Sequence, residues 1–353
     1  MILTIIITFF TLIVLIILHE FGHFILAKIF GVKVEEFGLG YPPRIFGKKI
    51  GETIYSLNLL PFGGFVKIYG QEEPIKDPKS FSSKPFWQRA LIIAGGVISF
   101  WLIAIILFTI LMTIGIPTVI DDSEEIQGLT EPKVQIVGIA KDSPAEMAGL
   151  KIGDVIKNFT KVKDVQEFTE INKGKEVVLT IQRGKEVFDI SLTPRVLPPD
   201  SEGPMGVALA RTTLKSYPLF QAFVNGIITT GKLTWVMIKT WIVVIENLIL
   251  KQGLPVGVEV GGPIKIFSLF TQAGELGVNY FIQFVAIITI QLALINILPF
   301  PALDGGWLMF MTIDKLRKKP IKPETIQKLS TAFFFFLIGL MIWVTIRDII
   351  EIF

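Results

Sequence analysis

Long hydrophobic segments separated by polar ones predict a membrane protein. Residues 1–18 carry no charge, and the apolar pattern continues to about Phe30, which is long enough to cross a hydrocarbon core roughly 30 Å thick. This stretch has no basic start and no small-residue cleavage site, so we expect it to be a retained span and not a signal peptide. Further apolar runs lie at about 90–116, 279–300 and 332–350.

These runs predict four transmembrane helices and divide the chain accordingly. The helices are expected at 1–30, 90–116, 279–313 and 332–353. Between them, we expect a loop region with β structure at 31–89 and an inserted soluble domain at 117–212. An amphipathic helix with its connections is predicted at 213–278, and a short loop at 314–331.

The segment 217–250 is apolar as well, but polar residues recur along it at intervals of seven. On a helix they form one stripe, made of Asn225, Lys232, Lys239 and Glu246. A helix with such a stripe favours the membrane interface or a groove in the protein. We therefore do not count this segment among the spans.

The distribution of Lys and Arg predicts the orientation of the spans. Ten of them lie between Lys28 and Arg89, and six more follow the third span, at Lys315, Arg317, Lys318, Lys319, Lys322 and Lys328. Loops rich in Lys and Arg face the cytoplasm. Both termini and the segment 117–216 are therefore expected on the outer side of the membrane.

Composition limits the chemistry that the chain can perform. Hydrophobic residues make up 51% of the 353 positions and the net charge is only +3, without the basic block that nucleic-acid binding requires. No Cys is present, which excludes disulfides, thiolate metal sites and a Cys nucleophile. Only two His residues occur, so any His-based metal site must use His19 and His23.

These two His residues belong to the motif His19-Glu20-Phe21-Gly22-His23, which fits H-E-x-x-H. Residues four apart lie on one face of a helix, so both imidazoles can hold one zinc ion while Glu20 reaches a water molecule on it. The alternative is a chance grouping of satisfied polar residues. Ionisable groups at membrane depth cost roughly 2.5–3.5 kcal/mol each on insertion scales, which favours a functional role.

A catalytic zinc site needs a third protein ligand, and the third span offers one acid, Asp304. It follows Pro299 and Pro301, which break the helix. Its alternative role is that of a helix N-cap. The predicted orientation favours the ligand, because the first and third spans run in the same direction and bring Asp304 to the depth of His19 and His23. The site then lies in the cytoplasmic half of the bilayer.

The segment 117–212 has the pattern of a small soluble domain. Residues 134–140 alternate like a strand, 142–150 read as a capped helix start, and Lys151–Ile156 as a turn into a strand. The stretch Ser143-Pro-Ala-Glu-Met-Ala-Gly-Leu150 with its following Gly-Asp resembles the bacterial, permuted type of PDZ domain. Such domains bind peptides by strand addition or only pack against a neighbour, and peptide gating and steric filtering both remain open.

Taken together, these features resemble the site-2 protease family of intramembrane zinc metalloproteases, of the RseP type with a single PDZ domain. The resemblance rests on H-E-x-x-H in the first span, on Asn296-Ile-Leu-Pro-Phe-Pro-Ala-Leu-Asp304-Gly in the third, and on the domain between spans two and three. It implies that His19, His23 and Asp304 bind zinc and that Glu20 is the general base. Asn296 would lie near the substrate backbone.

The resemblance also extends to two neighbouring segments. Residues 38–40 and 53–68, ending in Pro61-Phe-Gly63-Gly64-Phe65, are similar to the re-entrant β loop of the family, which implies substrate contacts at Gly63, Gly64 and Phe65. A peripheral hairpin on the cytoplasmic surface is the alternative. Near the second span the chain departs from the family, with Gly96 and Ser99 where Pro and Asn are usual.

We therefore expect a polytopic α-helical protein of the bacterial cytoplasmic membrane, with a re-entrant β loop and one extracytoplasmic α+β PDZ domain. By resemblance, its substrates would be single-pass transmembrane proteins already cut by a site-1 protease, such as anti-sigma factors or remnant signal peptides. The lipid bilayer is the other partner, and nucleic acid is excluded. An inactive scaffold would not need Glu20, and a metal transporter would carry more intramembrane carboxylates and His than this chain has.

Overall fold

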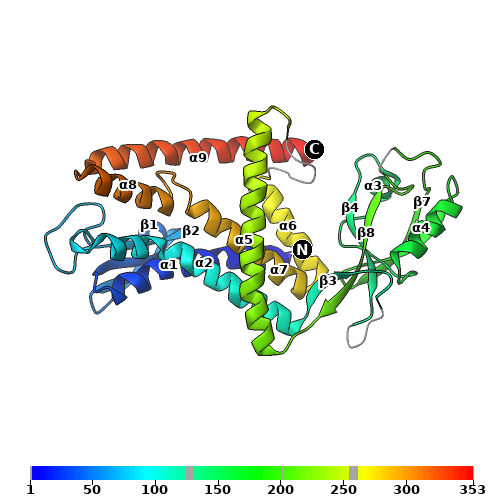
Figure 1. The fold of residues 1–353 in the computed structure, drawn as a ribbon, viewed down its shortest axis with the longest axis horizontal. Helices are drawn as coiled ribbons and strands as arrows, with labels where there is room; N and C mark the ends of the chain where they lie inside the picture. The colour runs from blue at the N-terminus through cyan, green and yellow to red at the C-terminus, as the bar shows by residue number, and fades with distance from the viewer. Residues whose placement is uncertain (1, 125–129, 200–201, 254–260, 353) are drawn as a thin grey trace. The chain divides into compact units, whose positions relative to one another are not determined.

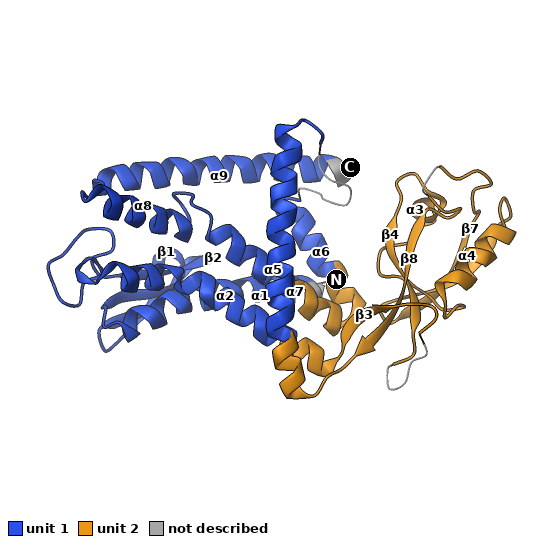
Figure 2. Cartoon of the chain, viewed as in Figure 1, with its two compact units in different colours: residues 1–108, 226–271, 285–353 blue, residues 109–225, 272–284 orange. Residues whose placement is uncertain are grey.

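The computed structural model describes residues 2–352 apart from 125–129, 200–201 and 254–260 (Figure 1). The chain divides into two compact units (Figure 2). Unit 1 comprises residues 1–108, 226–271 and 285–353, and unit 2 comprises 109–225 and 272–284. The three gaps fall in the predicted soluble domain 117–212 and in the predicted connecting region 213–278, so those predictions lie partly outside the described residues.

Five helices in the described ranges are long and apolar enough to cross a membrane. They are α1 (Ile2–Ile29), α2 (Phe86–Ile114), α5 (Leu219–Ile249), α7 (Val278–Asn296) and α9 (Pro323–Ile352). Helices suit such segments because each backbone polar group is paired within the segment, where lipid offers no partner. Four of them, α1, α2, α7 and α9, overlap the runs that the sequence predicts as spans.

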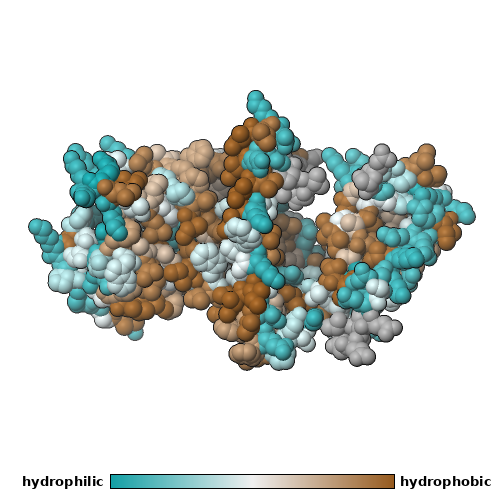
Figure 3. Space-filling view, in the orientation of Figure 1, coloured by the Kyte–Doolittle hydropathy of each residue, from teal (hydrophilic) through white to brown (hydrophobic). Residues whose placement is uncertain are grey.

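The fifth, α5, meets the same criteria of length and composition although its polar stripe argues for an interfacial position. Lys232, Lys239 and Glu246 of that stripe are exposed, and many large apolar side chains of the helix are exposed as well. Hydrophilic and hydrophobic positions follow one another along α5 (Figure 3). The number of four spans therefore stays a prediction.

The first two helices cross at a pair of glycines. A Cβ at Gly22 would lie 2.1 Å from the carbonyl oxygen of Gly95, and a Cβ at Gly95 would lie 2.6 Å from that of Gly22. Small residues allow such close backbone approach between apolar helices. The contact lies inside the H-E-x-x-H motif, so it places α2 directly against the predicted metal site.

The predicted third span, 279–313, is not one continuous helix. Helix α7 ends at Asn296, and α8 (Asp304–Arg317) begins after a non-helical connection, as Pro299 and Pro301 predict. Gly305 lets this connection pack on the start of α8, because a Cβ there would lie 2.2 Å from the carbonyl oxygens of Ile297 and Leu298. The break therefore sets the position at which α8 begins, and with it the position of Asp304.

Two strands of unit 1, β1 (Val34–Ile50) and β2 (Thr53–Ile68), form an antiparallel sheet that contains the predicted strand-like runs. Phe37 has a partner on both sides, Tyr55 and Val66, while Gly64–Ile68 pair with β1 on one side only among the described residues. Asn58, which the sequence patterns did not single out, is buried and donates to the carbonyl oxygens of Leu39 and Gly40. The re-entrant position of this sheet stays a prediction.

Unit 2 contains a six-stranded sheet in the order β3-β8-β4-β5-β6-β7. The strands are β3 (Ile116–Ile120), β4 (Lys133–Ile139), β5 (Val155–Ile156), β6 (Val177–Arg183), β7 (Glu186–Leu192) and β8 (Val207–Lys215). Helices α3 (Pro144–Met147) and α4 (Val162–Ile171) accompany the sheet, and α6 (Pro263–Leu276) precedes α7. The core is aliphatic, with Val134, Ile136, Ile156, Leu179 and Ile181 buried.

The capped helix predicted at 142–150 is confirmed. The Ser143 hydroxyl accepts a hydrogen bond from the backbone amide of Glu146 at 3.2 Å, and the Glu146 carboxylate accepts one from the amide of Asp142 at 2.6 Å. Ser143 is the N-cap residue and Asp142 precedes it, so the two bonds together satisfy backbone donors at the helix start. The strand predicted at 134–140 is present as β4, and the predicted turn from Lys151 into a strand ends in β5.

Candidate metal centre

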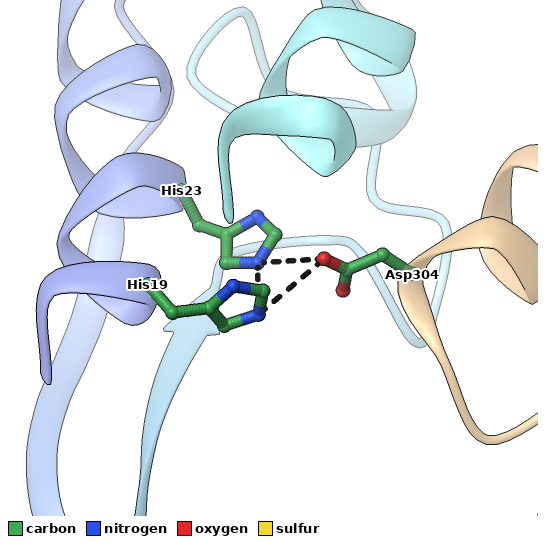
Figure 4. A group of neighbouring side chains, drawn as sticks. All are labelled: His19, His23 and Asp304. Carbon is green, nitrogen blue, oxygen red and sulfur yellow. Dashed lines mark hydrogen bonds and ion pairs between the residues drawn. The ribbon is translucent and has the colours of Figure 1, made fainter. Parts of the chain in front are cut away.

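Two helices of unit 1 bring three metal-binding side chains together (Figure 4). His19 and His23 lie one turn apart on α1, as the helical spacing requires. Asp304 is the first residue of α8 and points at both imidazoles. The Oδ2 atom of Asp304 lies 3.4 Å from Nε2 of His19 and 3.3 Å from Nε2 of His23, and the two Nε2 atoms are 3.4 Å apart.

These three distances fit a zinc ion. The donor atoms form a nearly equilateral triangle with sides of 3.3–3.4 Å. A regular tetrahedron with that edge has its centre about 2.1 Å from each corner, and zinc binds His nitrogen and carboxylate oxygen at roughly 2.0–2.2 Å. The three donors could therefore take three corners of a zinc tetrahedron, and a catalytic zinc site uses three protein ligands and an open fourth position.

Each donor is held so that its ligand atom faces the centre. The Nδ1 atom of His23 is 2.9 Å from the backbone carbonyl of Ile92, which favours the tautomer with an unprotonated Nε2. The His19 ring stacks on Phe100 with centroids 4.6 Å apart. Both His side chains are buried, at 8% and 7% exposure for the two residues.

Asp304 does not have the alternative role of a helix cap. Leu303 occupies the N-cap position of α8, and the Asp304 carboxylate is turned toward α1. Within the described chain, its Oδ2 atom is buried without a hydrogen-bond partner. A buried carboxylate oxygen without a donor is costly, and a cation at the centre of the triangle would relieve that cost. The prediction that Asp304 is the third metal-binding group is thus supported by its geometry.

Glu20 lies between α1 and the β sheet. A Cβ at Gly64 would lie 3.3 Å from Glu20 Cγ, and the backbone amide of Val66 interacts with the Glu20 carboxyl group. The side of β2 that lacks a strand partner therefore runs past the carboxyl group next to His19. The structure thus brings Glu20 and Gly64, which are distant in the sequence, to the same site.

The other residues that the sequence predicts to contact the substrate each have different neighbours. Asn296 ends α7, and its side-chain amide donates to the Leu292 carbonyl oxygen at 2.9 Å, while its own side-chain oxygen has no donor among the described residues. Phe65 covers Gly38, where a Cβ would lie 2.4 Å from its ring. Gly63 lies against the ring of Tyr41.

Gly96 is part of the site, although the sequence indicated it only as a departure from the family pattern. A Cβ at this position would lie 2.3 Å from Cε1 of His19 and 2.4 Å from Nε2 of His23. Any side chain on this face of α2 would therefore displace an imidazole or fill the metal position. A missing side chain has no pattern of its own in a sequence, which is why this role was not predicted.

Replacing Gly96 by Ala is expected to lower both the zinc content and the activity of the purified protein. Alanine favours a helix over glycine by about 1 kcal/mol, so helix propensity alone would stabilise the variant. Zinc per chain by elemental analysis checks the result. Gly339→Ala in α9 is the matched control, because a Cβ there meets no atom within 4 Å. Full zinc occupancy in Gly96→Ala would contradict the packing argument.

Comparison with known proteins agrees with this geometry. Peptidase family M50 matches residues 7–340. A protein of Clostridium perfringens named as a zinc metalloprotease is 35% identical over 95% of both chains. The zinc metalloprotease RasP of Oceanobacillus iheyensis is 28% identical, over 96% of this chain and 97% of its own. The regulator of sigma-W protease RasP of Bacillus subtilis is 25% identical over 96% of both chains. This chain therefore belongs to peptidase family M50, the site-2 proteases, and is a multi-pass membrane zinc metalloprotease.

Proposed function

We propose that this protein hydrolyses peptide bonds within transmembrane segments of single-pass membrane proteins. His19, His23 and Asp304 would bind the zinc, and Glu20 would act as general base. The observation that carries the proposal is the triangle of donor atoms with sides of 3.3–3.4 Å, two of which belong to α1, a helix apolar enough to cross a membrane. Glu20, next to His19 in the chain, supplies a second carboxylate for the role of the hydrolytic base.

The metal ion and the protein side chains would contribute different parts of the catalysis. When bound, zinc supplies a Lewis acid that polarises the scissile carbonyl and acidifies a water molecule. Glu20 accepts a proton from the attacking water and passes it to the leaving nitrogen. His19 and His23 are buried, and electrostatic interactions are stronger in such surroundings than in bulk water.

The substrate helix must unwind before its backbone can be attacked, and two features of unit 1 would support the extended segment. Gly64–Ile68 pair with β1 on one side only among the described residues, so their other side can accept a strand. The free amide oxygen of Asn296 can accept a hydrogen bond from a substrate amide. These contacts would replace the hydrogen bonds that the substrate loses when it leaves its helix.

Replacing Asn296 by Leu is expected to slow turnover without changing the zinc content. The side chains are similar in size, so the change mainly removes the acceptor that would hold the substrate backbone. Turnover and zinc content are measured on the same preparation. Gln291→Leu, on the same helix α7, is the control for loss of an amide. Loss of zinc from Asn296→Leu would contradict this assignment.

Unit 2 would act as a PDZ domain that limits access to the site. A pocket of about 370 Å³ lies between α4 and the start of β8, lined among others by Thr169, Met205 and Val207. Strand β3 pairs with Arg211–Lys215 of β8, so the part of this edge that remains for a peptide is short. Peptide binding there and steric exclusion of bulky outer domains would both favour substrates already cut by a site-1 protease.

The distribution of Lys and Arg along the chain supports a proposal for the orientation of the protein in the membrane. The protein would reside in the bacterial cytoplasmic membrane with both termini and unit 2 outside the cytoplasm. The Lys and Arg residues of 28–89 and 315–328 would face the cytoplasm. Anti-sigma factors and remnant signal peptides are the substrate classes expected for this arrangement.

The test uses two purified single-pass substrates, one with a short outer tail and one with a folded outer domain. We expect the short-tailed substrate to be cut, with the cut mapped by mass spectrometry inside its apolar segment, and phenanthroline to stop the reaction. The bulky substrate should be cut much more slowly. Cuts only outside the apolar segment would refute intramembrane proteolysis, and equal cleavage of both substrates would refute gating.

A further inference from the structure

A serine of helix α9 contacts the chain just before Asp304. The Ser330 hydroxyl donates a hydrogen bond to the backbone carbonyl of Pro301 at 2.8 Å, and the two residues are 29 positions apart in the sequence. One turn further along α9, the Phe333 ring stacks on Phe300, with centroids 5.0 Å apart and planes inclined by 22°. The first part of α9 is therefore tied to the connection between α7 and α8 at two consecutive residues of that connection (Figure 1).

Two other hydroxyls on the long helices of unit 1 bond differently from Ser330. Thr345, also in α9, donates to the carbonyl of Met341, four residues earlier. Thr289 of α7 donates to the carbonyl of Val285 in the same way. A bond to the preceding turn is a common way for Ser and Thr to satisfy their hydroxyl within a helix. Ser330 instead bonds a distant segment, so its hydroxyl holds two parts of the fold together.

The connection that α9 holds is packed closely on the beginning of α8. A Cβ at Gly306 would lie 2.1 Å from the carbonyl oxygen of Phe300, so the peptide that links Phe300 to Pro301 rests on the first turn of this helix. The backbone amide of Leu303 also donates to the Phe300 carbonyl oxygen, at 2.9 Å. Because Asp304 lies between these contacts in the chain, a shift of the Pro301 carbonyl would move the Asp304 carboxylate as well.

Asp304 needs such support because its ligand atom has no other. His23 is oriented by a contact of 2.9 Å between its Nδ1 atom and the carbonyl oxygen of Ile92. The Oδ2 atom of Asp304, in contrast, is buried without a hydrogen-bond donor among the described residues. The position of this oxygen is therefore set by the backbone at the start of α8.

We propose that Ser330 is a positioning residue of the metal site, which holds the Pro301 carbonyl and thereby sets the place of Asp304 in the triangle of donor atoms. This inference rests on the proposed role of Asp304 as a zinc ligand. Groups that orient a ligand without touching the metal raise the affinity for the metal, because less rearrangement is needed when it binds. The effect of Ser330 should therefore appear in zinc affinity.

A different role for the Ser330 bond is to stabilise the packing of α9, as hydrogen bonds between helices do in membranes. Loss of the hydroxyl would then lower the stability of the protein, but the affinity for zinc and the geometry of the bound metal would not change. A metal in the site therefore separates the two roles. Cobalt is a suitable probe because its visible absorption depends on the number and arrangement of its ligands.

The test is Ser330→Ala in the full-length protein, with zinc affinity measured by competition with a chelator and the visible spectrum recorded after cobalt replaces zinc. We expect zinc affinity to fall about tenfold, the lower end of the range for residues that support a metal ligand. The cobalt spectrum should change as well. Ser330→Thr keeps the hydroxyl and should retain wild-type affinity. Thr345→Val is the matched control, because it removes from α9 a hydroxyl whose bond lies within that helix.

Three outcomes would overturn the inference. One is a wild-type zinc affinity and cobalt spectrum in Ser330→Ala, since the bond would then serve stability alone. Another is an equal loss of affinity in Ser330→Thr, which would show that the hydroxyl is not the cause. The third is an equal loss of affinity in Thr345→Val. Full zinc affinity in Asp304→Asn would instead refute the proposed ligand set, so the two failures can be told apart.

Discussion

Replacing Glu20 by Gln is expected to lower cleavage of a transmembrane substrate about a thousandfold while the zinc remains bound. Glutamine has nearly the same shape as glutamate but cannot accept the proton of the attacking water, and general-base catalysis contributes about 10²–10⁴-fold. Glu20 does not supply any of the three donor atoms of the triangle, so its replacement leaves the proposed metal ligands intact.

The measurement pairs single-turnover cleavage with zinc analysis on the same preparation. Glu35→Gln is the matched control, because it makes the same charge change in β1, where Glu35 pairs with Lys67 at 3.2 Å. The control should cut at the wild-type rate. A Glu20→Gln protein that still cuts would show that another group accepts the proton, and the proposed mechanism would then be wrong.

Replacing Asp304 by Asn is expected to remove most of the zinc and, with it, the activity. The change keeps the size of the side chain but replaces an anionic ligand with a neutral amide. Loss of a group that only supports a ligand costs about 10–100-fold in metal affinity, and a direct ligand should cost at least as much. Zinc per chain after dialysis, together with the rate of cleavage, measures the effect.

Asp314→Asn in the same helix α8 is the control for this change. Asp314 accepts a hydrogen bond from the Ile321 amide at 2.7 Å, away from the metal-binding atoms, and should not affect zinc content. Full zinc occupancy in Asp304→Asn would exclude Asp304 from the ligand set. The two replacements are expected to differ in kind, since Glu20→Gln loses catalysis with zinc bound and Asp304→Asn loses the zinc itself.

Much of this site could be predicted from the sequence because its signals are local. The i, i+4 spacing of His19 and His23 at the end of a long apolar run predicts a shared ligand face without knowledge of any other segment. The prolines before Asp304 predict a break in the apolar run, and the structure has α8 begin at that residue. The N-cap bond of Ser143 is local in the same way.

Other parts of the site could not be predicted because they depend on contacts between distant segments. The close approach of Gly22 and Gly95 sets the distance between α1 and α2, and Gly96 leaves room for both imidazoles. Glycine contributes to these contacts by the absence of a side chain, so neither hydrophobic periodicity nor motif spacing reveals it. The polar stripe of α5 was likewise ambiguous, because length and composition also fit a span.

By itself, the sequence determined which groups could perform chemistry: two His, one adjacent Glu and one Asp in an otherwise apolar stretch. Hydrophobic length and helical spacing are properties of single segments, so they can be read without a fold. Only the tertiary structure decided that Asp304 closes a triangle with sides of 3.3–3.4 Å. It likewise brought Glu20 of α1 against Gly64 of β2, because such contacts result from the packing of distant segments against one another.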